Sequence, residues 1–464
     1  MAAIRTNTSV PSKRHRATYT VARDERITNA DVILDPAFPY GEDLLQFLWE
    51  AQLFDGRDLH TTDGRPVAVV RAGTIQHNSG PDLIDAAIRL EGQLWAGTVE
   101  VHLRASDWDR HGHQHDPAYN SVILHVVYQH DRDVRTVRGT TPPTVALSGR
   151  IDPLRVDLHA TLMKERDRIP CKGMIQRALP PDLDGWLHEL MLQRVERKAA
   201  GVIAAYDALG NDPAETLYCS LLQGFGLKVN AEAFTMLARS LPLRVLSKYR
   251  DDPMRVEALL FGQAGMLRVD LIDAYPRLLQ QEYAALAGLH GLHPIPTSVW
   301  RFARMRPADL PTVRIAQFAG LFTALDGDLG GLLSTDDPDV LLARLDAGTS
   351  DHWNTHYGFE HASAPRAKRL GAATAERIIA NTVVPYLYAM GLVRADALLK
   401  AKALRLLERL PPERNAITAE WESLGVAQRH AGQSQALIEL RNLHCGQRAC
   451  LSCVIGMELL RSPK

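Results

Sequence analysis

The stretch that decides the fold is residues 77–103, HNSGPDLIDAAIRLEGQLWAGTVEVHL. Residues 83–90 and 94–103 are rich in β-branched and apolar side chains, and the short Glu-Gly-Gln turn between them predicts a β-hairpin. Segments of the same character predict further strands at 66–75, 120–131 and 143–149. Residues 42–54 carry apolar side chains at helical spacing, which predicts an amphipathic helix ahead of the sheet. We therefore expect an α/β core built around the hairpin.

Acidic and imidazole groups lie at the same end of this hairpin. Pro81 and Asp82 precede the first strand, and Glu100 and His102 lie two apart on the second. Residues two apart in a strand share a face, and pairing of the strands carries Asp82 toward Glu100. Two close carboxylates repel each other, and a divalent cation such as Mg²⁺ or Mn²⁺ relieves that repulsion. The pattern predicts a metal site in which Asp82 and Glu100 are ligands and His102 is a catalytic base.

The connection after the hairpin, SDWDRHGHQHDPAYN at residues 106–120, is rich in histidine. His111 and His113 are candidates for holding a substrate phosphate, together with Tyr119. An alternative is a His/Asp metal centre formed by His102, His111, His113 and Asp116, because imidazole suits Zn²⁺, Mn²⁺ or Fe²⁺. Alternating histidines in a loop are expected to point in different directions and lack a fixed zinc spacing.

Composition and charge bound the remaining choices. The 464 residues favour two or three domains, and a formal net charge of −1 gives the whole chain no bulk attraction to nucleic acid. No apolar run is long enough for a transmembrane helix, and no secretory signal is found, so a cytoplasmic protein is expected. From about residue 182 the pattern becomes helical. We expect a basic arm at 1–30, an α/β domain at 40–180 and a helical domain at 181–464.

Five cysteines suggest a second metal site rather than disulfides, because their number is odd and a reducing compartment is expected. Cys445, Cys450 and Cys453 form a C-x4-C-x2-C group near the C-terminus. A closed site needs a fourth ligand. Cys171 is preferred over His444 and over Cys219, which lies in an apolar helical pattern. The group predicts either zinc or a [4Fe–4S] cluster.

The helix followed by Pro81-Asp82 and by Glu100-x-His102 resembles the PD-(D/E)xK, or restriction-endonuclease-like, nuclease superfamily. The resemblance implies an α/β core with a mixed sheet, and it assigns Asp82 and Glu100 to the metal. It also allows Glu50, on the preceding helix, to supply an extra catalytic acid. His102 stands where the superfamily has lysine. Several of these nucleases carry an iron–sulfur cluster held by one distant cysteine and a C-terminal group of three, which is similar to the arrangement of cysteines here.

The chain as a whole also resembles a bacterial family catalogued as domain of unknown function 2851. The matching stretches include LLQFLWEAQLF, HNSGPDLIDAAIRL, WAGTVEVHLRASDWDRHGHQHDPAYN, IANTVVPYLYAMG and HCGQRACLSCVIG, and they span most of residues 42–456. The resemblance implies a shared fold.

Taken together, the sequence predicts an α+β protein with a nuclease-like core and a large helical domain. The expected function is metal-dependent cleavage of phosphodiester bonds in DNA or RNA. Two alternatives stay open: a catalytically inactive protein that binds nucleic acid or acts as a scaffold, and a His/Asp metal hydrolase that acts on a small molecule.

Overall fold

The computed structural model describes residues 38–463 apart from 77–78, 268–270 and 360. The predicted basic arm at 1–30 lies outside this range. The chain divides into two compact units, Met1–Ile151 and Asp152–Lys464, and each has its own hydrophobic core. The predicted domain boundary was residue 180, so the structure places residues 152–180 with the helical unit.

The first unit, the α/β unit, is built on a mixed sheet with the strand order β1-β3-β4-β5-β6, and β2 also pairs with β3. Its strands are β1 (Val67–Arg71), β2 (Thr74–Ile75), β3 (Leu83–Leu90), β4 (Gln93–Arg104), β5 (Val122–Gln129) and β6 (Thr144–Ala146). β1, β3 and β4 are antiparallel, whereas β5 runs parallel to both β4 and β6. All six strands lie in the segments that the sequence predicts, and β4 extends one residue beyond its predicted segment at each end.

The hairpin pairs Leu83 with Val99, and the parallel ladder pairs Glu100 of β4 with His125 of β5. Helix α1 (Glu42–Glu50) buries Leu45 and Trp49 in the core of the sheet. The Trp49 indole N–H donates to the carbonyl of Ala72 at 3.1 Å, which fixes the helix on the sheet. The predicted helix at 42–54 therefore forms but ends four residues earlier.

The connection from β4 to β5 consists of three short helical turns: α2 (Asp107–Arg110), η1 (His113–His115) and η2 (Pro117–Ser121). Trp108 is fully buried and forms a small core with Tyr119, Val122 and Val134. Its indole N–H donates to the carbonyl of Arg135 at 3.1 Å. This packing holds the histidine-rich connection against the end of the sheet.

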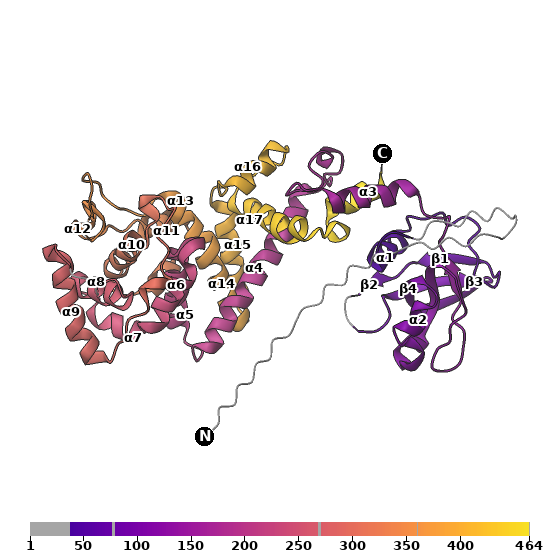
Figure 1. Cartoon of the computed structure of the whole chain (residues 1–464), viewed down its shortest axis with the longest axis horizontal. Helices are drawn as coiled ribbons and strands as arrows, with labels where there is room; N and C mark the ends of the chain where they lie inside the picture. The colour runs from indigo at the N-terminus through magenta and orange to yellow at the C-terminus, as the bar shows by residue number, and fades with distance from the viewer. Residues whose placement is uncertain (1–37, 77–78, 268–270, 360, 464) are drawn as a thin grey trace, which may run out of the picture. The chain divides into compact units, whose positions relative to one another are not determined.

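The second unit, the helical unit, begins with α3 (Pro153–Lys164) and the long α4 (Leu183–Ala208). The other helices up to the middle of the unit are α5 (Pro213–Phe225), α6 (Leu227–Ser240), α7 (Leu243–Leu246), α8 (Pro253–Gln263), α9 (Ala274–His290), α10 (Pro311–Ala324) and α11 (Pro338–Leu345). The remaining helices are α12 (Asp351–Asn354), α13 (Ala372–Ile378), α14 (Val384–Val393), α15 (Ala397–Arg409), α16 (Ala416–Ser423), α17 (Ala431–Glu439) and α18 (Val454–Arg461). Figure 1 shows α4 running along α14 and α17.

Aspartate–proline pairs start several of these helices, as the sequence pattern suggests. Asp152, Asp212, Asp252 and Asp337 are each an N-cap followed by proline, and each side chain accepts a backbone N–H from the first turn. Two segments are π-helical, Ile379–Val383 and Leu440–Cys445. A short hairpin, β7 (His356–Gly358) with β8 (His361–Ala362), is the only sheet in the described part of this unit.

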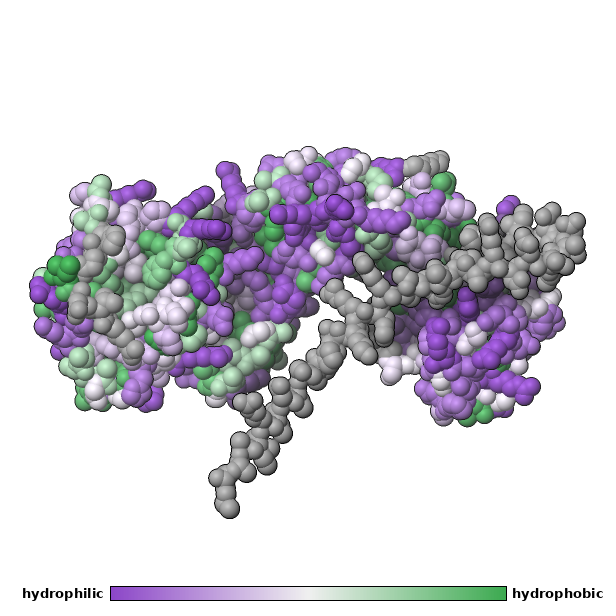
Figure 2. All heavy atoms as spheres, in the orientation of Figure 1, coloured by the Kyte–Doolittle hydropathy of each residue, from purple (hydrophilic) through white to green (hydrophobic). Residues whose placement is uncertain are grey.

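The architecture confirms the prediction of an α+β protein with a mixed sheet followed by many helices. No described helix is long and apolar enough to cross a membrane. On the face seen in Figure 2 the described atoms of the α/β unit are mostly hydrophilic, whereas the surface of the helical unit mixes hydrophilic and hydrophobic residues.

Candidate metal centre in the α/β unit

Strand β4 supplies two buried polar side chains at its parallel edge. Glu100 is 3% exposed and His102 is 1% exposed, and both lie on the same face of the strand. The Oε1 atom of Glu100 lies 3.5 Å from Nε2 of His102. Burial of polar groups in a core is costly unless they have partners, so these two residues need other groups close to them.

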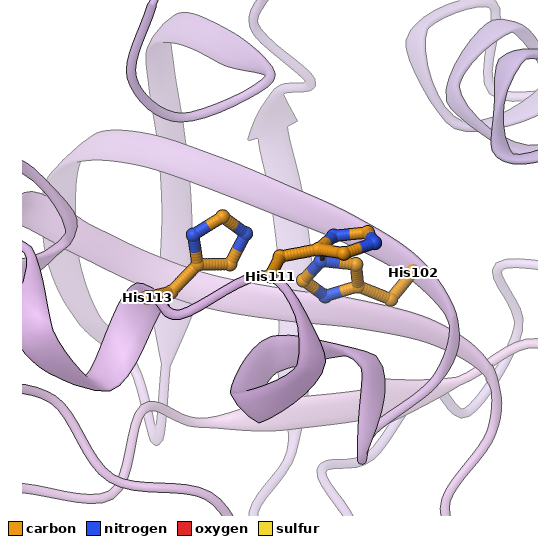
Figure 3. A group of neighbouring side chains, drawn as sticks. All are labelled: His102, His111 and His113. Carbon is orange, nitrogen blue, oxygen red and sulfur yellow. Dashed lines mark hydrogen bonds between the residues drawn. The ribbon is translucent and has the colours of Figure 1, made fainter. Parts of the chain in front are cut away.

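Those groups come from the α2–η1 segment. His111 is the C-cap of α2, His113 begins η1, and Gly112 between them has a φ of 82°. This left-handed conformation is easily adopted only by glycine. It turns the chain so that both imidazoles face His102, as Figure 3 shows. The expectation that alternating histidines diverge is wrong for this pair, because the segment is a tight turn rather than an extended loop.

The result is a compact set of metal-ligand atoms. One nitrogen each of His102, His111 and His113 lies within 4.8 Å of the other two. Nε2 of His102 is 3.1 Å from Nδ1 of His111. Glu100 Oε1 is 3.1 Å from Nε2 of His113, but the geometry is not that of a hydrogen bond, and this buried nitrogen has no hydrogen-bond partner in the described structure. Three imidazoles and a carboxylate form a donor set that suits Zn²⁺, Mn²⁺ or Fe²⁺.

Backbone hydrogen bonds fix the two predicted carboxylates. Oε2 of Glu100 accepts the backbone N–H of Asp82 at 3.0 Å, and Oδ2 of Asp82 accepts the backbone N–H of Val101 at 3.0 Å. This reciprocal pairing pins β4 to the start of β3 and leaves Glu100 Oε1 directed at the histidines. Asp82 is close enough to His113 and His111 for their charges to lower its pKa, against the increase that burial causes, but it is not a member of the histidine group.

Burial controls the protonation of the centre. It raises the pKa of Glu100 to about 9, and the neighbouring Asp82 adds to the shift. Burial also lowers the pKa of His102 to about 2, with further contributions from His125, His113 and His111. The pKa of His113 is lowered by burial as well. Near neutral pH His102 and His113 are therefore neutral, and neutral imidazole is the form that binds a metal.

His125 of β5 supports the centre from behind. It is fully buried, and its Nε2 lies 2.9 Å from Nδ1 of His102. If His102 binds an ion through Nε2, its Nδ1 carries the proton and donates to His125. Such a hydrogen bond fixes the orientation of a metal-bound imidazole. The sequence places His125 in an apolar run, which favours a plain core histidine, and the parallel pairing of β4 with β5 is what brings it to His102.

The structure places the other predicted residues around the centre or away from it. Tyr119 is 7% exposed and stacks on His113, with ring centroids 3.7 Å apart. The side chain of Asp116 caps η2 by accepting the N–H of Ala118. Glu50 accepts the backbone N–H of Ile75 at 2.9 Å, so this carboxylate holds β2. His115 is exposed.

Sequence reasoning missed two residues on α1. Burial raises the pKa of Glu42. The nearby Asp107 and Asp82 raise this pKa further, whereas His111 lowers it. Gln46 hydrogen-bonds the Asp82 side chain. Both share a helix face with Glu50, because the three residues are spaced by four. This row of polar residues along one face of a mostly apolar helix was the available clue.

The four predicted cysteine ligands lie together in the helical unit. Cys171, Cys445, Cys450 and Cys453 are all buried and unoxidised, and they perturb one another's pKa values. Cys219 is on α5, where Glu215 and Arg239 are its charged neighbours. The structure therefore groups four of the five cysteines.

Comparison with known proteins adds a family. The sequence model of the family described as "Protein of unknown function (DUF2851)" matches residues 42–416. The chain belongs to this family. The match covers the whole candidate metal centre and Cys171 and ends before Cys445. No curated protein and no solved structure matches the chain.

Proposed function

We propose that this DUF2851 protein is a metal-dependent hydrolase of phosphodiester bonds, a nuclease, with its ion held by His102, His111, His113 and Glu100. The observation that carries the proposal is the group of three histidine nitrogens within 4.8 Å of one another, with the Glu100 carboxylate beside it. Gathering several metal-ligand atoms on a buried strand and the adjoining turn costs free energy unless these atoms bind an ion.

The donor set favours Mn²⁺ or Zn²⁺ over Mg²⁺. Mg²⁺ prefers oxygen ligands and keeps several waters, whereas imidazole suits the transition metals. When bound, such an ion supplies an activated water and positive charge for the oxygens of the phosphate. In the overall reaction the water oxygen bonds to phosphorus and one ester P–O bond breaks. The leaving alkoxide takes up a proton, so the products are a phosphomonoester and an alcohol.

The order of elements supports a nuclease among the hydrolases. A helix, α1, precedes four antiparallel strands, β1 to β4, of which β2 has only two residues, and a crossover then leads to the parallel strand β5. This order is similar to that of the PD-(D/E)xK core. Asp82 and Glu100 stand at that superfamily's acidic positions, and His102 at the position of its lysine. A neutral histidine here is better suited to holding an ion than to carrying fixed charge.

The chain's own residues would orient the substrate from the open side. His111 is exposed, and the side chain of the adjacent Arg110 is 67% exposed while its guanidinium pairs with Asp107 at 2.9 Å. An arginine next to the ion can bind a phosphate oxygen. His102 and Glu100 are buried away from this open side.

The charge of the unit supports a second candidate, a hydrolase of small phosphodiesters. Residues 38–151 contain fifteen acidic residues against ten arginines and no lysine. Such a surface does not attract a long polyanion, so affinity would have to come from the ion and nearby arginines.

The test uses the full-length protein, stripped of metal with a chelator and then supplied with Mn²⁺, Zn²⁺ or Mg²⁺. Substrates are single- and double-stranded DNA and RNA, and bis(p-nitrophenyl) phosphate as the small diester. We expect cleavage with Mn²⁺ or Zn²⁺ that His113→Ala and the Asp82→Ala, Glu100→Ala pair lower by at least about 100-fold. His115→Ala, in the same segment but exposed, should retain activity.

Cleavage of the small diester alone would favour the second candidate. If no substrate is cleaved above the level of the His113→Ala protein, the hydrolase proposal fails. Nucleic-acid binding that survives both chelation and the Asp82→Ala, Glu100→Ala pair would instead indicate a protein that binds without catalysis.

A further inference from the structure

Two distant segments of the helical unit bring four cysteines together. Cys171 lies between α3 and α4, and the other three follow one another from Cys445, at the end of a π-helical turn, to Cys453, the N-cap of α18. Each is between 6% and 8% exposed, and none is in a disulfide. It is unusual for four reduced, buried thiols from two segments more than 270 residues apart to lie together unless they bind a common ligand.

The two segments are joined at this point by an arginine. Arg448 donates to the carbonyl of Cys445 at 2.8 Å and to the carbonyls of Glu165 and Asp167, in the loop before Cys171. Gly456 of α18 packs so closely that a Cβ there would lie 2.2 Å from the carbonyl oxygen of Cys450. The loop and the C-terminal segment are therefore fixed to each other next to the thiols.

Hydrogen-bond donors and positive charges surround the sulfurs. The backbone N–H groups of Ile455 and Gly456, at the start of α18, point to the sulfur of Cys453. Arg448 and Arg441 favour the thiolates of Cys450 and Cys445, respectively. Nε of Arg441 and Nδ1 of His444 are buried without a hydrogen-bond partner in the described structure. Such donors commonly stabilise the sulfurs of a metal cluster.

The spacing of the sulfurs distinguishes a cluster from a single ion. A tetrahedral zinc site with Zn–S bonds of 2.3 Å needs sulfurs about 3.8 Å apart. Within the described chain, only the histidine group of the α/β unit has three ligand atoms within 4.8 Å of one another. No three of the four cysteine sulfurs therefore meet that limit. This spacing does not match a single tetrahedral zinc ion and favours a larger group held by four thiolates.

We propose that Cys171, Cys445, Cys450 and Cys453 hold a [4Fe–4S] cluster in the helical unit. The cluster replaces four S–H protons with four iron–thiolate bonds. It links the loop after α3 to the C-terminal segment, and its iron and sulfide are supplied by cluster assembly rather than by any reaction of this protein. The site is independent of the histidine centre, so neither proposal depends on the other.

The experiment is anaerobic purification of the full-length protein, followed by measurement of iron, acid-labile sulfide and zinc and by a visible spectrum. Protein isolated without iron is incubated anaerobically with ferrous iron and sulfide and measured again. We expect about four iron and four sulfide per chain and a broad visible band that dithionite bleaches. Cys171→Ser and Cys453→Ser should lose most of the iron. Cys219→Ser is the matched control, because Cys219 is also a buried thiol but lies outside the group, and it should keep its iron.

Stoichiometric zinc without sulfide would overturn the proposal, as would failure of the unchanged protein to take up iron during reconstitution. Equal loss of iron from the Cys219→Ser protein would also overturn it. The metal content of the unchanged protein decides the matter even if the serine variants do not fold.

Discussion

His111, His113 and His115 alternate along one short segment, but only the first two face His102. The difference comes from Gly112, whose φ of 82° reverses the chain between the first pair, whereas His113 and His115 lie on one 3₁₀ turn. The residue types and their spacing were visible in the sequence. Which of the imidazoles converge depends on one backbone angle, and no pattern of histidines specifies that angle.

A first prediction concerns these three histidines. Replacing His113 with alanine removes one ligand atom, so the affinity of the metal-free protein for Mn²⁺ or Zn²⁺ should fall by at least about ten-fold. His115→Ala should leave the affinity unchanged, because that side chain is exposed and outside the group. Isothermal titration calorimetry on chelator-treated protein measures both. Equal effects of the two substitutions would show that the ion is held elsewhere.

Lys198 of α4 provides a prediction on pH. Its ammonium donates to Oδ1 of Asn381 at 2.6 Å, and burial, reinforced by Arg194, lowers its pKa to about 7. The unfolded chain, with an ordinary lysine pKa of 10.5, binds more protons than the folded chain between these values. Stability therefore rises with pH in that range. Below about pH 7 the folded protein bears the full cost of the buried charge.

Lys198→Met removes this cost. Its stability relative to the natural chain should be greatest below pH 7, by roughly 1–3 kcal/mol, and the advantage should shrink as the pH approaches 10.5. Denaturant unfolding of the helical unit at several pH values measures the difference. An advantage that does not change with pH would mean that the pKa of Lys198 is the same in the folded and the unfolded chain.

At the scale of helices and strands, local rules predicted most of the elements. The hairpin of β3 and β4 follows from alternation and a turn, and the helices that begin at aspartate–proline pairs follow from capping. The pairing of β4 with β5 is not local, because it depends on how the intervening turns pack beneath Trp108. That pairing brings His125 to His102. The sequence pattern therefore could not predict that His125 contacts His102.

Helices α4 and α17 are joined by a buried ionic network that carries a prediction of its own. Glu439 is 1% exposed and binds Arg194 at 2.9 Å and Arg197 at 2.6 Å. Arg194 also donates to Oε1 of Gln435 at 2.6 Å. Glu439→Ala leaves a buried guanidinium without its counter-charge, which should cost about 3–5 kcal/mol of the helical unit's stability.

The same two helices offer a matched control. Arg429, just before α17, pairs with Asp184 of α4, and both side chains are more than 60% exposed. Arg429→Ala should cost about 1 kcal/mol at most, because an exposed ion pair is weak. Urea unfolding followed by circular dichroism compares the two variants. Similar losses in both would mean that the Glu439 network is no stronger than a surface pair.

At the scale of the whole molecule, the boundary between the units was the least predictable feature. The strongly helical pattern starts near residue 182, which favoured a boundary at 180. The structure assigns α3 to the helical unit, where Arg155 donates to the carbonyl of Arg461 at 2.9 Å. In the loop that follows α3, close to the thiols, the carbonyl of Asp167 accepts a hydrogen bond from Arg448. These contacts join positions about 300 residues apart, and no local pattern reveals them. The family match at 42–416 crosses the boundary, so both units belong to the family's architecture.

The division also predicts how the molecule unfolds. One core contains buried residues from Leu45 to Leu147 and the other from Leu162 to Leu459, with none in common. Each unit should therefore unfold in its own thermal transition. An ion that binds the histidine centre stabilises only the unit that holds it. At a free concentration 100 times its Kd, Mn²⁺ or Zn²⁺ should add about 2.7 kcal/mol to the α/β unit.

Differential scanning calorimetry of chelator-treated protein, with and without Mn²⁺ or Zn²⁺, measures this effect. The transition of the α/β unit should move to higher temperature while that of the helical unit stays in place, and His113→Ala should abolish the shift. Movement of both transitions, or a single cooperative transition, would show that the units are coupled more tightly than their separate cores imply. A shift confined to the helical unit would instead place the ion at the cysteines, because those four thiols are the other candidate ligand set.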